Sequence, residues 1–102
     1  GNYLEGSGSA MYAYVFAVGA RKGYLDSKYR LIAEQAFDGI IRELISVDAK
    51  GFITFRNICG GCGLGGNPYR DGSYEYYINE KRVINDTKGV GPFIMAAIEL
   101  DR

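Results

Sequence analysis

The sequence predicts a mainly α-helical fold whose helical layers are incomplete within its 102 residues. Residues 9–22 and 92–101 are apolar on nearly every side, and such helices need neighbours all round. Residues 27–46 carry only one apolar stripe, and a single helix of that kind cannot cover two others. We therefore expect one domain over 1–102 that is an incomplete piece of a layered helical structure, with a short β-hairpin or long loop region at 51–91.

The first half predicts an antiparallel helical hairpin. Residues 9–22 contain the run AMYAYVFAV, with Ser9 placed as the N-cap. In residues 27–46 apolar pairs recur every four to five positions between charged residues, which is typical of a helix with one exposed face. Asp26 or Ser27 supplies its start signal.

The second half predicts less regular structure. Residues 52–55, FITF, are expected to form a short strand, and residues 57–74 are rich in Gly, Asn and Pro. Residues 74–78, YEYYI, fit either a second strand or an aromatic loop. The last helix is expected at 92–101, with Pro92 at its first position.

The composition excludes several classes of function. Twelve basic residues balance twelve acidic ones without a basic run, which argues against a nucleic-acid partner. No apolar segment is long enough to cross a membrane, so no membrane partner is expected. Histidine is absent, which removes the commonest general base and excludes a Ser-His or Cys-His mechanism within this chain.

The stretch CGGCGLGG, residues 59–66, invites three interpretations as a chemical site. Its GxGxxG spacing follows a possible strand, but NPYRDGSY comes next, where a dinucleotide-binding turn needs a helix. Two thiols without histidine are too few for a structural zinc site, and Gly60-Gly61 does not suggest the helix start of a redox CxxC. A tight glycine loop is favoured, without metal or cofactor, and Cys59 and Cys62 are able to form a local disulfide.

The loop carboxylates and tyrosines are candidates for carbohydrate chemistry. A pair of carboxylates can perform acid/base work on a glycosidic bond, although Asp and Glu in loops more often cap helices and turns. Tyrosines offer aromatic faces for sugar rings and hydroxyls for hydrogen bonds, or else pack on the helices. The carboxylates are Glu5, Asp71, Glu75 and Asp86, and the tyrosines are Tyr69, Tyr74, Tyr76 and Tyr77.

Three stretches resemble a known family over essentially the whole chain. They are EGSGSAMYAYVFAVGARKGYLDSKY, the Cys-Gly loop, and GGNPYRDGSYEYYINEKRVINDTKGVGPFIMAAIE. Together they resemble the C-terminal portion of bacterial unsaturated rhamnogalacturonyl hydrolases, in glycoside hydrolase families 88 and 105. One departure is Gly6, where the resemblance leads us to expect Thr.

The resemblance implies an (α/α)6 toroid of inner helices ringed by outer ones, of which this chain is an incomplete piece. It also implies an oligosaccharide substrate ending in an unsaturated uronic acid, whose C4–C5 double bond is hydrated with an Asp as general acid/base. No metal or organic cofactor is implied. That Asp lies in sequence this chain does not contain, so we expect no catalytic residue here and no activity from the chain alone.

In such a toroid the cleft is built from loops at one end of the inner helices. We therefore expect substrate-binding residues in the segments that lead into residues 9–22 and 92–101, and in the loop between them. They are Glu5, Ser7, Ser9, Arg70, Tyr74, Asp86 and Lys88. A carbohydrate-binding module without catalysis is the alternative. Uncovered apolar helices also predict self-association or helix exchange between chains.

Overall fold

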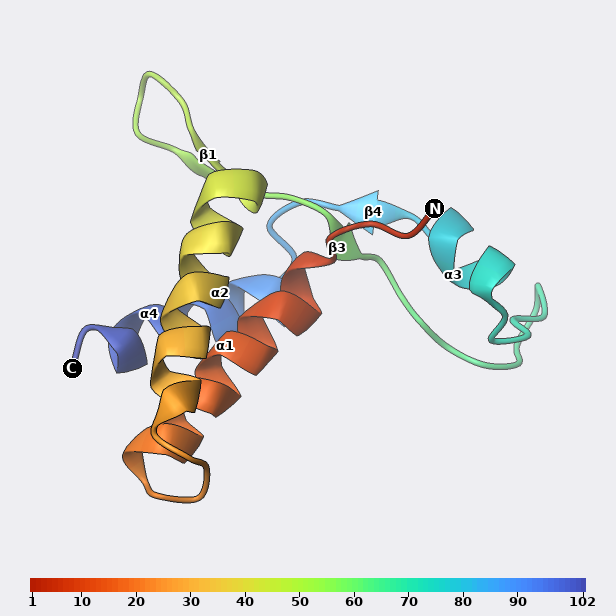
Figure 1. Cartoon of the computed structure of the whole chain (residues 1–102). Helices are drawn as coiled ribbons and strands as arrows, with labels where there is room; N and C mark the ends of the chain where they lie inside the picture. The colour runs from red at the N-terminus through yellow and green to blue at the C-terminus, as the bar shows by residue number, and fades with distance from the viewer.

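The computed structural model describes all residues, 1–102, and consists of four helices and four short strands (Figure 1). The elements are α1 (Gly6–Arg21), α2 (Lys28–Leu44), β1 (Ile45–Val47), β2 (Ile53–Phe55), β3 (Ile58–Cys59), α3 (Tyr74–Asn79), β4 (Arg82–Val83) and α4 (Thr87–Leu100).

Helix α1 is the centre of the helical layer and packs against both α2 and α4. The connection from α1 to α2 is short, so the two helices run antiparallel (Figure 1). Helix α4 runs parallel to α1, since Gly6 and Gly89 near their amino ends both contact Phe55, while Arg21 and Glu99 near their carboxyl ends form an ion pair. Two parallel helices with an antiparallel partner are what a toroid of helical hairpins contains.

Small residues on α1 allow this close packing. Ala10, Ala13 and Ala17 are fully buried and form the face of α1 that meets its neighbours. Aromatic rings pack beside them. The Phe93 ring stacks on Phe37 with 5.0 Å between the ring centroids, and its centroid lies 5.4 Å from that of Phe55. The core comprises Ala10, Ala13, Ile40, Leu44, Phe55, Ile58 and Ala96.

The strands form two small antiparallel pairs. β1 pairs with β2 through Ile45↔Phe55, and β3 pairs with β4 through Ile58↔Val83. The strand predicted at 52–55 is confirmed with a start one residue later. Its partner β1 was assigned to the helix 27–46, which instead ends at Leu44, and β3 lies within the stretch 57–74 that was predicted to be irregular.

The predicted helix starts at Ser9 and Pro92 were wrong. Helix α1 begins at Gly6, because the Glu5 carboxylate accepts from the backbone N–H groups of Ser7 and Gly8 and is therefore the N-cap. Helix α4 begins at Thr87 with Asp86 as its N-cap, and Pro92 lies inside the helix. In both cases an acidic side chain satisfies the free N–H groups one turn or more before the expected start.

The aromatic segment 74–78 was also predicted wrongly, since it forms neither a strand nor a loop. It is the helix α3, which the Ser73 side chain caps by accepting the Tyr76 N–H at 3.1 Å. Helix α3 and the loop before it extend to one side of the helical layer, away from the β1–β2 hairpin (Figure 1).

The apolar helices are not covered by this chain, as predicted. On α1, Tyr12 and Val15 are 65% and 54% exposed, and on α4, Ile94 and Ile98 are 51% and 59% exposed. Side chains of this kind normally lie inside a protein. None of the helices combines the length and the hydropathy that a membrane crossing requires.

Candidate functional site

The amino ends of α1 and α4 lie together on either side of the β2–β3 corner. A Cβ atom on Gly6 would lie 2.8 Å from Cε2 of Phe55, and one on Gly89 would lie 2.7 Å from Cδ1 of Ile58. Real Cβ atoms do not come this close, so a larger residue at either position would require the Phe55 ring or the Ile58 side chain to shift. This end carries five of the predicted binding residues, namely Glu5, Ser7, Ser9, Asp86 and Lys88.

Glu5 is the most heavily bonded of these residues. Its carboxylate accepts hydrogen bonds from the backbone N–H groups of Ser7 at 3.1 Å, Gly8 at 2.6 Å and Cys59 at 2.9 Å. Burial by itself raises the pKa of the Glu5 carboxyl, but these hydrogen bonds outweigh it and hold the pKa below its ordinary value. Glu5 is therefore a fixed anion that joins the start of α1 to the end of β3.

The two serines after Glu5 point to different places. Ser7 donates its hydroxyl to Glu5 Oε1 at 2.7 Å and so belongs to the same cluster. Ser9 donates its hydroxyl to the Glu5 carbonyl at 2.6 Å and lines a mainly apolar hollow between α1 and α2. The structure therefore separates Ser9 from the Glu5 carboxylate.

Asp86 and Lys88 form an ion pair at the start of α4. Asp86 Oδ1 accepts the Lys88 N–H at 2.9 Å, and Asp86 Oδ2 lies 3.0 Å from Lys88 Nζ. The backbone N–H and then the side chain of Lys88 lower the pKa of Asp86. Both side chains keep partial exposure, so the pair offers one acceptor and one donor of opposite charge to a polar ligand.

Arg70 lies against two glycines of CGGCGLGG, Gly63 and Gly66. Its guanidinium donates to the carbonyls of Gly65 at 2.9 Å and Leu64 at 3.2 Å, so it lies inside the glycine loop. A Cβ atom on Gly63 would overlap the Arg70 guanidinium, and one on Gly66 would lie 3.2 Å from Nη2. No helix follows these glycines until α3, so the spacing forms a cradle for an arginine and not a dinucleotide turn.

A hollow of about 500 Å³ lies between this loop and α3. Most of its lining residues carry polar groups, which are a guanidinium, a carboxylate, a phenol and two side-chain amides. Such groups suit the hydroxyls of a sugar, and the tyrosine offers an aromatic face. The lining residues are Gly66, Asn67, Pro68, Arg70, Tyr76, Asn79 and Glu80.

Tyr76 and Glu80 form the fixed part of this hollow. The Tyr76 hydroxyl donates to Glu80 Oε2 at 2.6 Å and accepts the Gly63 N–H at 3.3 Å. The hydrogen bond raises the pKa of Tyr76 and is the main reason that the pKa of Glu80 is lowered. The pair therefore connects α3 to the glycine loop.

The structure brings Arg70 together with Tyr76 and not with the predicted Tyr74. Tyr74 is 53% exposed at the first position of α3 and does not line the hollow. Tyr76 was among the loop tyrosines considered for sugar contact, but Asn79, Glu80 and the pairing of Tyr76 with Glu80 were missed because α3 was not recognised. The available signal was Ser73, an N-cap residue that is followed by Glu75 in the first turn and by a Tyr76–Glu80 pair at helical spacing.

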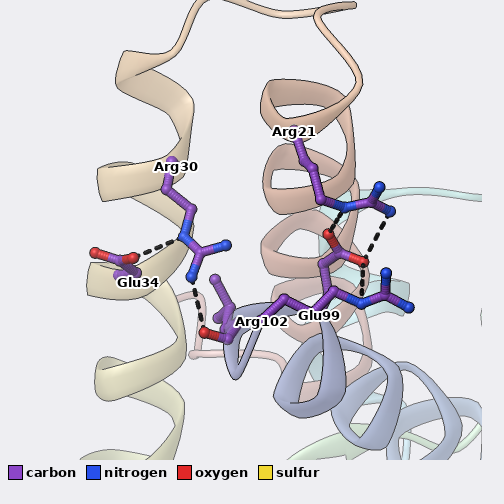
Figure 2. A network of polar contacts seen from close by, with 6 residues as sticks. Arg21, Arg30, Glu34, Glu99 and Arg102 are labelled. Atoms are coloured by element: carbon purple, nitrogen blue, oxygen red, sulfur yellow. Dashed lines mark hydrogen bonds and ion pairs between the residues drawn. The ribbon is translucent and has the colours of Figure 1, made fainter.

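A second polar network lies at the opposite end of the helices (Figure 2). Arg21 of α1 forms a two-pronged ion pair with Glu99 of α4, whose side chain is buried, and Arg102 lies 3.7 Å from the same carboxylate. Arg30 of α2 donates to Glu34 and to the Leu100 carbonyl, both at 2.7 Å. These contacts tie the carboxyl end of α4 to α1 and α2, so we assign them to packing. No group of three or more side chains is arranged to hold a metal ion.

Comparisons with known proteins place the whole chain in one group. The sequence model of Glycosyl Hydrolase Family 88 matches residues 1–102. Similar proteins include Protein Atu3128 of Agrobacterium fabrum and a 24.9 kDa protein in the picA locus of Rhizobium radiobacter. Each is 41% identical over 105 residues, which cover 97% of this chain and 45% of the relative.

A solved structure is similar as well. A family 105 glycoside hydrolase of C. acetobutylicum matches with a TM-score of 0.93 and 45% identity, over 98% of this chain and 28% of that chain. The chain thus spans less than half the length of the curated relatives it matches, and about a quarter of the solved hydrolase.

Proposed function

The chain belongs to glycoside hydrolase family 88, and on that premise we propose that it forms part of the wall of a cleft for oligosaccharides that end in an unsaturated uronic acid. The family fold is an (α/α)6 toroid, and α1, α2 and α4 are a piece of it. The observation that carries the proposal is that the amino ends of α1 and α4 meet. In a toroid of this family the cleft lies at one end of the inner helices, so polar residues near these two amino ends are placed to contact a sugar.

The chemistry of this end supports a sugar ligand. The Asp86–Lys88 ion pair and the Arg70–Tyr76–Glu80 hollow present donors and acceptors whose charges nearly cancel. Lys88 and Arg70 are the cations suited to a uronate carboxylate, while Tyr76 and Glu80 suit hydroxyls. Glu5 and Ser7 hold the start of α1 in place, and the Glu5 carboxylate also accepts the Cys59 N–H, which fixes the end of β3 beside it.

We assign no catalytic role to any residue of this chain. Hydration of the C4–C5 double bond needs a general acid/base, which the family resemblance places on an Asp outside these 102 residues. Asp86 is held as an anion by Lys88, which does not fit a group that must donate a proton near neutral pH. The chain alone is therefore expected to be inactive.

The activity is tested with an unsaturated rhamnogalacturonan disaccharide. Loss of the double-bond absorbance is followed with the purified 102-residue chain and, as a positive control, with a full-length family 105 hydrolase. We expect turnover only in the control. Strong turnover by the chain itself would refute the assignment of the general acid/base to other sequence.

A carbohydrate-binding module without catalysis is the second candidate, favoured by the polar hollow beside Arg70. Titration of the chain with a galacturonide oligosaccharide, followed by amide chemical shifts, distinguishes the two. Saturable shifts at Arg70, Tyr76 and Lys88 without turnover are expected for a binding module. Absence of shifts at millimolar ligand excludes it.

The uncovered helices add a proposal about assembly. Tyr12, Val15, Ile94 and Ile98 leave an apolar surface on α1 and α4 that water would otherwise contact. We propose that two copies of this chain cover it by self-association or by exchange of helices. Light scattering at tens of micromolar protein is expected to give a mass above 11.2 kDa, and a stable monomer would contradict the proposal.

A further inference from the structure

The two cysteines of the chain lie side by side at the end of β3. Cys59 is the last residue of β3 and is buried, whereas Cys62 is exposed three residues later. Their sulfur atoms are 2.7 Å apart, and both are free thiols. No step of the proposed sugar chemistry uses them.

The chain on both sides of the pair is held by contacts that do not involve sulfur. The Gly60 N–H donates to the Lys81 carbonyl at 2.6 Å, and a Cβ atom on Gly60 would lie 2.7 Å from that oxygen, so only glycine fits there. The Tyr76 hydroxyl lies 3.1 Å from the Gly61 carbonyl and accepts the Gly63 N–H at 3.3 Å. Folding therefore fixes the turn that brings Cys62 back onto Cys59.

This fixed turn has an energetic consequence. Closing a disulfide costs the conformational freedom of the residues between the thiols. In the folded protein most of that cost has already been met, because strand pairing and the Tyr76 contacts define the turn. In the unfolded chain the same CxxC has to be ordered when the bond forms.

We propose that Cys59 and Cys62 are a thiol–disulfide modification site, at which the folded protein favours an intramolecular disulfide over both the free thiols and a mixed disulfide. The partner is a low-molecular-weight disulfide such as oxidised glutathione. This proposal does not rest on the proposed carbohydrate function.

The reaction balances as two exchanges. The exposed Cys62 thiolate attacks one sulfur of oxidised glutathione, which breaks the glutathione disulfide, releases one glutathione thiolate and leaves a mixed disulfide on Cys62. The Cys59 thiolate then attacks the Cys62 sulfur and releases the second glutathione. The protein loses two protons and two electrons, which together are two hydrogen atoms, and one oxidised glutathione becomes two reduced ones.

The surroundings of Cys62 make it a slow attacking thiol. Partial burial, then the hydrogen bond and the charge of Cys59, and finally Glu80 and Glu5 raise the pKa of Cys62 to about 11. The thiolate is therefore scarce near neutral pH. The site suits a persistent disulfide and not a rapidly cycling redox catalyst.

The loop that carries the two cysteines also contacts both parts of the candidate site. The Cys59 N–H holds Glu5 at the start of α1, while Gly61 and Gly63 hold Tyr76 in α3. The loop 59–63 thus connects the two parts of the candidate site through hydrogen bonds, and a disulfide would cross-link this loop between residues 59 and 62.

The test equilibrates the full chain with mixtures of oxidised and reduced glutathione at mildly alkaline pH, folded and in urea. In acid-quenched samples the number of free thiols per chain is determined, and the mass of the chain is measured by mass spectrometry. We expect the folded wild type to lose both thiols and two hydrogen atoms without gaining glutathione. Its equilibrium constant for disulfide formation is expected to exceed that of the urea-unfolded chain about tenfold.

Two single variants locate the steps. Cys59→Ser is expected to stop at a mixed disulfide with glutathione, because the second exchange has no thiol. Cys62→Ser, which keeps only the buried thiol, is expected to react more slowly than Cys59→Ser. A wild type that keeps its thiols or retains glutathione, or an equilibrium constant no larger folded than unfolded, would overturn the proposal.

Discussion

Two helical glycines provide a matched test of how the candidate site is positioned. A Cβ atom on Gly89 of α4 would lie 2.7 Å from Cδ1 and 3.0 Å from Cγ1 of Ile58, and 3.1 Å from Cε1 of Phe55. A Cβ atom on Gly39 of α2 would meet only the end of the Arg42 side chain, at 3.9 Å, and neither glycine has a positive φ. The variants Gly89→Ala and Gly39→Ala therefore differ mainly in their contact with the core.

The expected magnitude follows from two opposing effects. Replacing glycine by alanine inside a helix stabilises it by about 0.5–1 kcal/mol at either position. At Gly89 the added methyl group meets Ile58 and Phe55, which are 0% and 2% exposed. Overpacking of this kind costs about 1–3 kcal/mol. Since the helical gain cancels in the comparison, Gly89→Ala should be about 1–3 kcal/mol less stable than Gly39→Ala.

Thermal unfolding followed by circular dichroism measures this difference. For a domain of about this size 1 kcal/mol shifts the melting temperature by about 4–8 °C, so Gly89→Ala should melt at least about 4 °C below Gly39→Ala. All samples need one protein concentration, because self-association couples stability to concentration. If Gly89→Ala melts at or above Gly39→Ala, the close approach of α4 to the β2–β3 corner is wrong.

Three further predictions concern the carboxylates. Glu5→Gln should destabilise the fold near neutral pH, and the loss should vanish in acid. A lowered pKa gives stability that is fully present above the unfolded pKa of about 4.3 and is lost as the pH falls through the folded pKa. Unfolding midpoints of the wild type and the variant should therefore converge in acid, and a constant gap would contradict this. Arg21→Met should destabilise the fold by leaving the buried Glu99 carboxylate without its main partner, and the double variant with Glu99→Met should recover stability in the same melts. Tyr76→Phe should raise the pKa of Glu80 by removing its hydrogen bond, and a carboxyl NMR titration that shows no rise would count against the Tyr76–Glu80 pair.

The sequence predicted where the candidate site would gather better than it predicted the contacts within it. Glu5 and Asp86 were expected both as rim residues and as possible caps, and the structure shows them as the N-caps of α1 and α4. Arg70 was expected on the rim, but its cradle of glycines depends on a backbone bridge from Gly65 to Arg70 that no local pattern announces. Glu80 and its hydrogen bond to Tyr76 escaped notice because a six-residue helix is too short to show a period.

The residues alone determined that the chain is mainly helical, that two helices need neighbours, and that histidine-based catalysis is excluded, because periodicity and composition are local properties. Tertiary structure decided which helices run parallel, why Gly6 and Gly89 are glycines, and that Cys59 meets Cys62 beside Glu5. Those features depend on contacts between residues far apart in the chain. These contacts form only when the Phe55–Ile58 corner packs between the two helix ends, so no local pattern in the sequence contains them.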